Sequence, residues 1–139
     1  MLNTRGGRPA RFGYADQVAA LRVVVIDDIA DIRRLVGLIL GTAGHRVVAE
    51  AANGRDGVAV VLAHSPDLVV MDWQMPELDG VEATRRICER APGVRVVAFS
   101  SASDPGVRSE FLDAGAVAYH DKTDIGGLED TVARIAAGV

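Results

Sequence analysis

Five short apolar runs recur along the chain, separated by longer segments in which apolar and polar residues mix. The runs have the length of β-strands and consist mostly of Val, Ile, Leu and Ala; they cover residues 21–26, 47–52, 68–71, 94–99 and 116–119. Near-continuous apolarity, in place of strict alternation, is typical of strands that are covered on both faces of a parallel sheet. We therefore predict five buried strands.

The segments between the runs predict amphipathic helices. The first segment places Ile32, Leu35, Val36, Ile39 and Ala43 at the spacing of a single helix face. Three further segments repeat this spacing, with apolar residues at Val58, Val61 and Leu62, at Val81, Ile87 and Cys88, and at Leu128, Val132, Ile135 and Ala136.

Turn-forming residues support these boundaries. Gly44 stands where the first helix would end, and four further signals mark turns or helix starts: Asn53-Gly54, Ser65-Pro66, Pro92-Gly93 and Asp104-Pro105-Gly106. Five strands in alternation with five helices predict an α/β fold, an open and doubly wound parallel sheet with helices on both faces. An eight-unit barrel would need a longer chain.

Composition narrows the class of protein. The length of 139 residues predicts one domain, and 49% hydrophobic with 24% charged residues is ordinary for a globular chain. A single cysteine, Cys88, excludes an intrachain disulfide and a cysteine zinc cluster. The apolar runs are too short to span a membrane, and the N-terminal segment lacks the apolar core of a signal peptide. We expect a cytoplasmic protein without membrane contact.

Charge is unevenly distributed along the chain. Residues 1–20 carry Arg5, Arg8 and Arg11 against Asp16, so the net charge of −4 for the whole chain leaves −6 on residues 21–139. An acidic body argues against direct binding of nucleic acid, which clustered Lys and Arg drive. Arginines among Gly, Pro and Asn are typical of a solvated tail. We predict a flexible basic extension over residues 1–20 and a folded domain over residues 21–139.

Polar side chains follow four of the five predicted strands. Asp27 and Asp28 close the first strand, Asp72 closes the third, Ser100 closes the fourth, and Lys122 follows the fifth. In an open α/β sheet, ligands bind at the carboxyl ends of the strands, so we expect these side chains to converge at one edge.

Such an edge has a defined chemistry. Three close carboxylates repel one another unless a cation shares the site, and oxygen ligands without His or Cys select a hard cation such as Mg²⁺. A carboxylate beside Mg²⁺ and an ammonium group is a nucleophile toward phosphorus, which would form an aspartyl phosphate. Lys122 is the only lysine of the chain, which supports a role for its compact charge. The alternative, aspartates that only cap helices or turns, suits one aspartate better than three.

Four segments resemble the receiver domain of two-component response regulators, over about residues 21–137. Val-Val-Val-Ile-Asp-Asp at residues 23–28 resembles the acidic pair after the first strand. Asp-Leu-Val-Val-Met-Asp-Trp-Gln-Met-Pro-Glu-Leu-Asp-Gly at residues 67–80 resembles the phosphoacceptor segment. Val-Val-Ala-Phe-Ser at residues 96–100 and Gly-Ala-Val-Ala-Tyr-His-Asp-Lys at residues 115–122 resemble the fourth and fifth strands of that family. The resemblance implies a flavodoxin-like (βα)5 sheet with strand order 2-1-3-4-5.

The resemblance also implies the role of each site residue. Asp72 would accept a phosphoryl group from the phosphohistidine of a sensor histidine kinase. Asp28 and Asp72 would ligate Mg²⁺ together with the backbone carbonyl of Gln74, and Asp27 would assist through water. Lys122 would pair with the phosphoryl oxygens.

Two further residues would form a switch. The resemblance implies that Ser100 moves to hydrogen-bond the phosphoryl group, and that Tyr119 then shifts inward into the space near Ser100. This would change the face formed by the fourth helix, fifth strand and fifth helix, which receivers use to bind partners or to form homodimers. In physical terms it is a two-state equilibrium biased by one new set of charged contacts.

The chain departs from the family pattern near Lys122. Thr123 stands where many receivers have proline, and His120 and Asp121 are polar at a usually apolar strand end. We expect that Asp121 competes for Lys122. Three more residues, Trp73, Gln74 and Ser101, flank the acceptor or the phosphoryl position, and we expect them to tune access and dephosphorylation.

At 139 residues we expect no output domain within this chain. We expect either a stand-alone receiver that acts on a protein partner or the receiver piece of a longer regulator; the strand end at Ser100 is most similar to receivers of LuxR-type regulators. We expect no enzymatic turnover beyond self-phosphotransfer and slow autodephosphorylation. Two alternatives remain: a receiver-like module that binds partners without phosphorylation, and a small Mg²⁺-dependent phosphohydrolase with Asp72 as its nucleophile.

Overall fold

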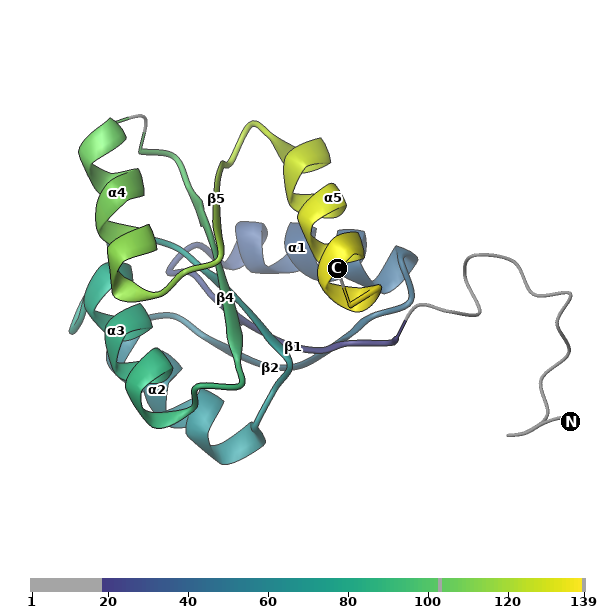
Figure 1. Ribbon diagram of the computed structural model, residues 1–139, viewed down its shortest axis with the longest axis horizontal. Helices are drawn as coiled ribbons and strands as arrows, with labels where there is room; N and C mark the ends of the chain where they lie inside the picture. The colour runs from purple at the N-terminus through teal and green to yellow at the C-terminus, as the bar shows by residue number, and fades with distance from the viewer. Residues whose placement is uncertain (1–18, 103, 139) are drawn as a thin grey trace, which may run out of the picture.

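The computed structural model describes residues 19–102 and 104–138. Within these residues five strands alternate with five helices (Figure 1). In chain order they are β1 (Arg22–Ile26), α1 (Ala30–Thr42), β2 (Arg46–Ala51), α2 (Gly54–His64), β3 (Leu68–Met71), α3 (Gly80–Arg90), β4 (Arg95–Ser100), α4 (Pro105–Ala114), β5 (Ala118–Asp121) and α5 (Ile125–Ala136).

The five strands form one parallel sheet in the order β2-β1-β3-β4-β5. The register aligns the carboxyl ends of neighbouring strands: Ile26 of β1 pairs with Ala51 of β2 and with Met71 of β3. The predicted α/β class and strand order are confirmed. The residues that directly follow β1 and β3 therefore meet at the same edge.

Both faces of the sheet are covered, as the continuous apolar runs predicted. One face packs against α1 and α5, where Val36, Leu40 and Leu128 contact Val23, Val25, Val70 and Phe99. The other face packs against α2, α3 and α4 through alternate strand residues, which include Val24, Ile26, Val69 and Met71. Because alternate side chains point to opposite faces, each apolar strand contributes to both cores.

Helix starts carry side-chain caps at four sites. Asn53, Asp79, Asp104 and Asp124 each accept a hydrogen bond from the main chain of the first turn of their helix. Beyond the end of α1, Gly44 has φ of +93°, a conformation that glycine adopts without strain. The signals predicted at Gly44, Asn53-Gly54 and Asp104-Pro105-Gly106 are confirmed, whereas the caps at Asp79 and Asp124 were not predicted.

Strand β5 lies two residues further along the chain than predicted, while the other strands agree to within one residue at each end. The apolar pattern predicted a strand over residues 116–119, whereas β5 covers Ala118–Asp121. His120 and Asp121 pair with Phe99 and Ser100 of β4. The ring of His120 contacts the hydroxyl of Thr131 at 2.7 Å, so the strand accommodates a polar side chain that the pattern placed outside it.

Most of the predicted N-terminal extension, residues 1–18, lies outside the described residues. Ala19 is described, and its N–H donates to the carbonyl of Ala136 at 3.1 Å. Among the described helices, none is both long and apolar enough to cross a membrane.

Candidate metal and phosphoryl site

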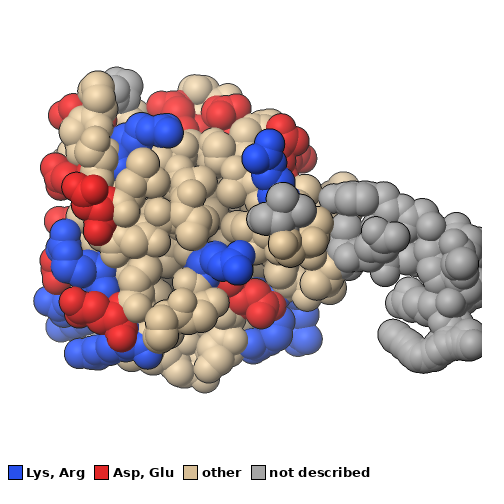
Figure 2. Space-filling model, in the orientation of Figure 1, with Lys and Arg blue, Asp and Glu red and all other residues tan. Residues whose placement is uncertain are grey.

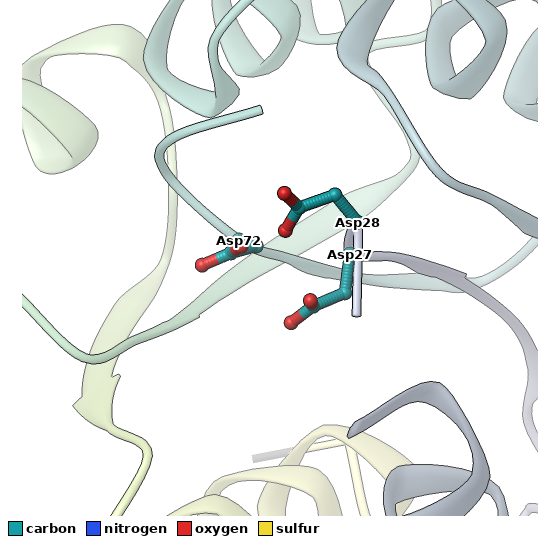
Figure 3. Close-up of side chains that lie close together, drawn as sticks. All are labelled: Asp27, Asp28 and Asp72. Atoms are coloured by element: carbon teal, nitrogen blue, oxygen red, sulfur yellow. The ribbon is translucent and has the colours of Figure 1, made fainter. Parts of the chain in front are cut away.

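Three aspartates meet at the carboxyl edge of the sheet (Figure 3). Asp27 and Asp28 leave the end of β1, and Asp72 leaves the end of the neighbouring β3. One carboxylate oxygen from each lies within 4.8 Å of the other two. Asp27 and Asp72 are buried, at 2% and 6% exposure, while Asp28 is exposed. The convergence predicted from the strand ends is therefore present.

Lys122 reaches this cluster from the loop after β5. Its ammonium nitrogen lies 2.8 Å from Oδ2 of Asp27 and 3.3 Å from Oδ1 of Asp72. Burial alone would lower the pKa of Lys122, but the hydrogen bond to Asp27 and the charges of the two carboxylates hold this pKa above its ordinary value. The ammonium group therefore stays charged and partly neutralises the cluster.

Asp72 has a perturbed acidity. Burial and the negative charge of Asp27 raise the pKa of Asp72 to about 6, although the N–H of Trp73 and the ammonium of Lys122 oppose this rise. Three carboxylates with one ammonium leave a net negative charge in a largely buried place. A bound cation would relieve this repulsion and keep Asp72 ionised.

Close packing holds the main chain of Asp72 in place. Gly80 begins α3, and its N–H donates to the carbonyl of Trp73 at 2.7 Å. A Cβ at Gly80 would lie 1.7 Å from the carbonyl oxygen of Asp72, so only glycine permits this approach. Asp79 and Gly80, which end the acceptor segment, thus have separate roles. Asp79 caps the start of α3, and Gly80 lets the end of β3 pack closely against α3.

A cavity of about 380 Å³ opens beside the carboxylates. Its lining includes Asp28, Asp72, Ser100 and Lys122, together with the three predicted tuning residues Trp73, Gln74 and Ser101. Gln74 and Ser101 are exposed and Trp73 is half-buried, so all three stand at the entrance. Their effect on access and dephosphorylation stays a prediction.

Ser100 and Tyr119 meet through Ala102. The hydroxyl of Ser100, which is 2% exposed, accepts a hydrogen bond from the N–H of Ala102 at 3.2 Å. The hydroxyl of Tyr119 donates to the carbonyl of the same residue. The Tyr119 ring also packs on Phe111 of α4, with 5.8 Å between ring centroids. The two predicted switch residues thus both bond to the main chain of Ala102, one to its N–H and the other to its carbonyl.

The expectation that Asp121 competes for Lys122 is wrong. Oδ1 of Asp121 accepts hydrogen bonds from the N–H of Thr123 at 2.8 Å and from its hydroxyl at 2.7 Å. Thr123, which stands where many receivers have proline, therefore bonds the Asp121 carboxylate in place of Lys122. These bonds lower the pKa of Asp121.

Three contributions were not predicted from the sequence. Ile29 and Ala102 also line the cavity, and Arg33 of α1 donates to the main-chain carbonyl of Asp27 at 2.7 Å. Ile29 could have been found from its position directly after Asp28. Ala102 acts through its main chain and Arg33 binds a main-chain carbonyl, and residue type gives no signal for either contact.

The donor set fits Mg²⁺. Among the described residues, the one group of acidic, His or Cys side chains close enough to share an ion consists of Asp27, Asp28 and Asp72. All its donors are carboxylate oxygens, which hard cations prefer, and the exposed Asp28 leaves room for water ligands. The acidic pocket therefore offers the ligands that Mg²⁺ prefers.

Comparisons with known proteins agree with this geometry. The family model of the response regulator receiver domain matches residues 23–133. The protein-glutamate methylesterase/protein-glutamine glutaminase 1 of Pseudomonas aeruginosa is 40% identical over 121 residues, which are 84% of this chain and 33% of that protein. The chain thus spans about a third of the length of the curated relatives that it matches.

Solved structures agree as well. A LuxR-family two-component response regulator from Aurantimonas sp. SI85-9A1 has 30% identity and a TM-score of 0.81, covering 86% of this chain and 87% of that one. The response regulator domain of Thermotoga maritima CheB has 28% identity and a TM-score of 0.77, covering 86% and 98%. The chain belongs to the response regulator receiver domain family of two-component signalling proteins.

Proposed function

We propose that Asp72 of this receiver domain accepts a phosphoryl group from a phosphohistidine of a sensor histidine kinase, in a reaction that needs Mg²⁺. The observation that carries the proposal is the approach of three carboxylates to within 4.8 Å of one another beside the ammonium of Lys122. Of the three, Asp72 combines burial with a place on the wall of the cavity, where a phosphoryl group has room.

The transfer balances with the groups at hand. An ionised carboxylate oxygen of Asp72 forms the new O–P bond while the P–N bond to the donor imidazole breaks, and the imidazole leaves with that electron pair. Burial and the charge of Asp27 raise the pKa of Asp72 to about 6, so nearby positive charge favours the ionised form of this nucleophile. Lys122 supplies one such charge and can also pair with a phosphoryl oxygen.

Asp28, Asp72 and the backbone carbonyl of Gln74 would hold the metal, with Asp27 acting through water. With the metal held there, charge on the carboxylates and on the transferred phosphoryl group would be neutralised. Asp27 stays in place through its own bonds, because its Oδ1 accepts from the N–H of Ile29 at 2.9 Å while its Oδ2 pairs with Lys122.

The hydrogen bonds of Ser100 and Tyr119 to Ala102 support a conformational switch that responds to phosphorylation. A phosphoryl oxygen on Asp72 would draw the Ser100 hydroxyl into the cavity and away from the N–H of Ala102. The carbonyl of Ala102 holds Tyr119, so this change would release the ring from its present place against Phe111 of α4. The face of α4, β5 and α5 would then change shape with the state of Asp72.

That face is the proposed contact surface for a downstream partner, an attached output domain or a second copy. Figure 2 views it, with uncharged surface through its middle and charged side chains at its margins. Val117 is 50% exposed and Leu112 is 38% exposed there.

We assign the chain no turnover beyond self-phosphotransfer and slow autodephosphorylation, and a cytoplasmic location. The likeness to receivers favours neither a phosphohydrolase nor a phosphorylation-independent module.

The single tryptophan, Trp73, gives a direct test, because it lines the cavity next to the acceptor. Its fluorescence should change when phosphoramidate and Mg²⁺ are added together, and should return after the donor is removed. Asp72→Asn should abolish the donor-dependent change. A donor-dependent change of equal size in that variant would refute Asp72 as the acceptor.

A further inference from the structure

Arg33 joins two elements behind the acidic cluster. Its NH1 donates to the main-chain carbonyl of Asp27 at 2.7 Å, and its Nε donates to a carboxylate oxygen of Glu50 at 2.8 Å. The Arg33 side chain lies on α1 and is only 19% exposed. Its guanidinium group thus ties the end of β1 to the neighbouring strand β2.

The hydrogen bond from Arg33 to the Asp27 carbonyl lies directly before Asp28, one of the proposed metal ligands. Asp27 leaves the sheet just after Ile26, and the exposed Asp28 follows it without a helical hydrogen bond of its own. The side chain of Asp27 is held by Ile29 and Lys122, but its carbonyl heads the peptide unit that carries Asp28. A donor on this carbonyl therefore restricts the main-chain unit from which the Asp28 carboxylate projects.

We propose that Arg33 is a positioning residue for the metal site: its two hydrogen bonds hold the peptide between Asp27 and Asp28 so that the carboxylate of Asp28 faces Asp72. The inference rests on the proposed Mg²⁺ site and adds the residue that aligns it. Groups that orient metal ligands without touching the metal typically contribute 10–100-fold to metal affinity.

Charge alone makes the opposite prediction. Arg33 is a cation near a cation-binding site, so its removal would strengthen Mg²⁺ binding if only long-range electrostatics mattered. If it positions the ligand instead, its removal weakens binding. The sign of the change in Mg²⁺ affinity therefore separates the two roles.

Arg34 provides a matched control. It is the next residue on α1, its side chain is 69% exposed, and it pairs with Asp31 on the surface. Arg34→Gln removes the same charge from the same helix but touches no atom of Asp27 or Asp28. A change shared by both variants would thus report charge, and a change specific to Arg33 would report position.

The experiment is a Mg²⁺ titration of the folded, unphosphorylated chain, followed by Trp73 fluorescence and by calorimetry. Arg33→Gln should raise the Mg²⁺ dissociation constant about 10-fold, and Arg34→Gln should leave it unchanged or slightly lower. Arg33→Lys keeps the charge but lacks the two-pronged guanidinium, so it should fall between native and Arg33→Gln.

The inference would be overturned if Arg33→Gln bound Mg²⁺ as tightly as the native chain or more tightly. It would also be overturned if Arg33→Gln and Arg34→Gln lost Mg²⁺ affinity equally while Arg33→Lys kept the native affinity. Failure of the native chain to bind Mg²⁺ would instead refute the proposed function, and the inference with it. Urea unfolding of each variant at saturating Mg²⁺ confirms that the titrated protein is folded.

Discussion

The ammonium of Lys122 lies 2.8 Å from a carboxylate oxygen of Asp27, closer than the 3.3 Å that separates it from Asp72. The lysine therefore acts mainly as the counter-charge of Asp27. A phosphoryl group on Asp72 would draw the lysine away from Asp27 and onto its own oxygens. The same side chain would thus have different partners before and after phosphorylation of Asp72.

Replacement of this lysine should separate metal binding from phosphotransfer. Lys122→Gln removes a cation that competes with Mg²⁺ for Asp27 and Asp72, so Mg²⁺ should bind ~3–10-fold more tightly. Phosphorylation by a small donor should become slower, because the phosphoryl oxygens lose their ammonium partner. Calorimetry and a time course of intact mass measure the two effects. Weaker Mg²⁺ binding in this variant would show that Lys122 supports the ligands more than it competes with metal.

The raised pKa of Asp72 predicts a dependence of stability on pH. An acid whose pKa rises from its ordinary 3.8 to about 6 on folding favours the folded state below pH 3.8, and this contribution is lost as pH rises through 6. In EDTA, the free energy of unfolding should fall over this window. Asp72→Asn has no charge to bury, so at pH 7 it should be more stable than the native chain by about 1–3 kcal/mol.

Urea unfolding at pH 4, 5, 6 and 7 in EDTA measures this difference, which should shrink toward the acid end. Saturating Mg²⁺ at pH 7 should remove most of it, because the metal stabilises the ionised native site. A less stable Asp72→Asn at pH 7 in EDTA would contradict the electrostatic description of the site.

The close approach of Gly80 to Asp72 predicts a strong effect of one methyl group. Gly80→Ala would place its Cβ 1.7 Å from the Asp72 carbonyl oxygen, so the strand end or α3 must move, at a cost of about 1–3 kcal/mol or more. Gly126→Ala is the matched control, since a Cβ at that position of α5 meets nothing within 4 Å. It should gain about 0.5–1 kcal/mol from helix propensity. Thermal unfolding that shifts equally in both variants would refute the steric argument.

Tyr119→Phe should loosen the switch without disturbing phosphorylation. The variant keeps the ring contact with Phe111 but loses the hydrogen bond to the Ala102 carbonyl. Loss of about 1 kcal/mol corresponds to ~5-fold faster local opening, which amide hydrogen exchange at Gly106 and Val107 would detect at the start of α4. Native exchange rates in the variant, or failure to phosphorylate, would argue against a link through Ala102.

Most of the fold follows from local patterns of the sequence. The runs at 21–26 and 68–71 are apolar at nearly every position because their strands are covered on both faces. Asp27 and Asp72 follow these strands directly, so parallel pairing in register is enough to bring them together. This is why the acidic cluster and Lys122 could be predicted from the order of residues alone.

Contacts made by main-chain atoms could not be predicted in this way. The bond from Arg33 to the Asp27 carbonyl depends on how α1 sits against β2, and no spacing of residue types records it. Asp121 is a different case, because an Asp side chain commonly accepts a hydrogen bond from the main-chain N–H two residues further on. Attention to Thr123 as a donor would have removed Asp121 as a competitor for Lys122.

The most direct test of the central claim is the intact mass of the chain after incubation with a small phosphodonor and Mg²⁺. The native chain should gain the mass of one phosphoryl group, and the gain should be absent without Mg²⁺ and absent in Asp72→Asn. Addition of phosphate to Asp72→Asn at the native rate, or no addition to a native chain that binds Mg²⁺, would contradict the assignment of Asp72 as the phosphoacceptor.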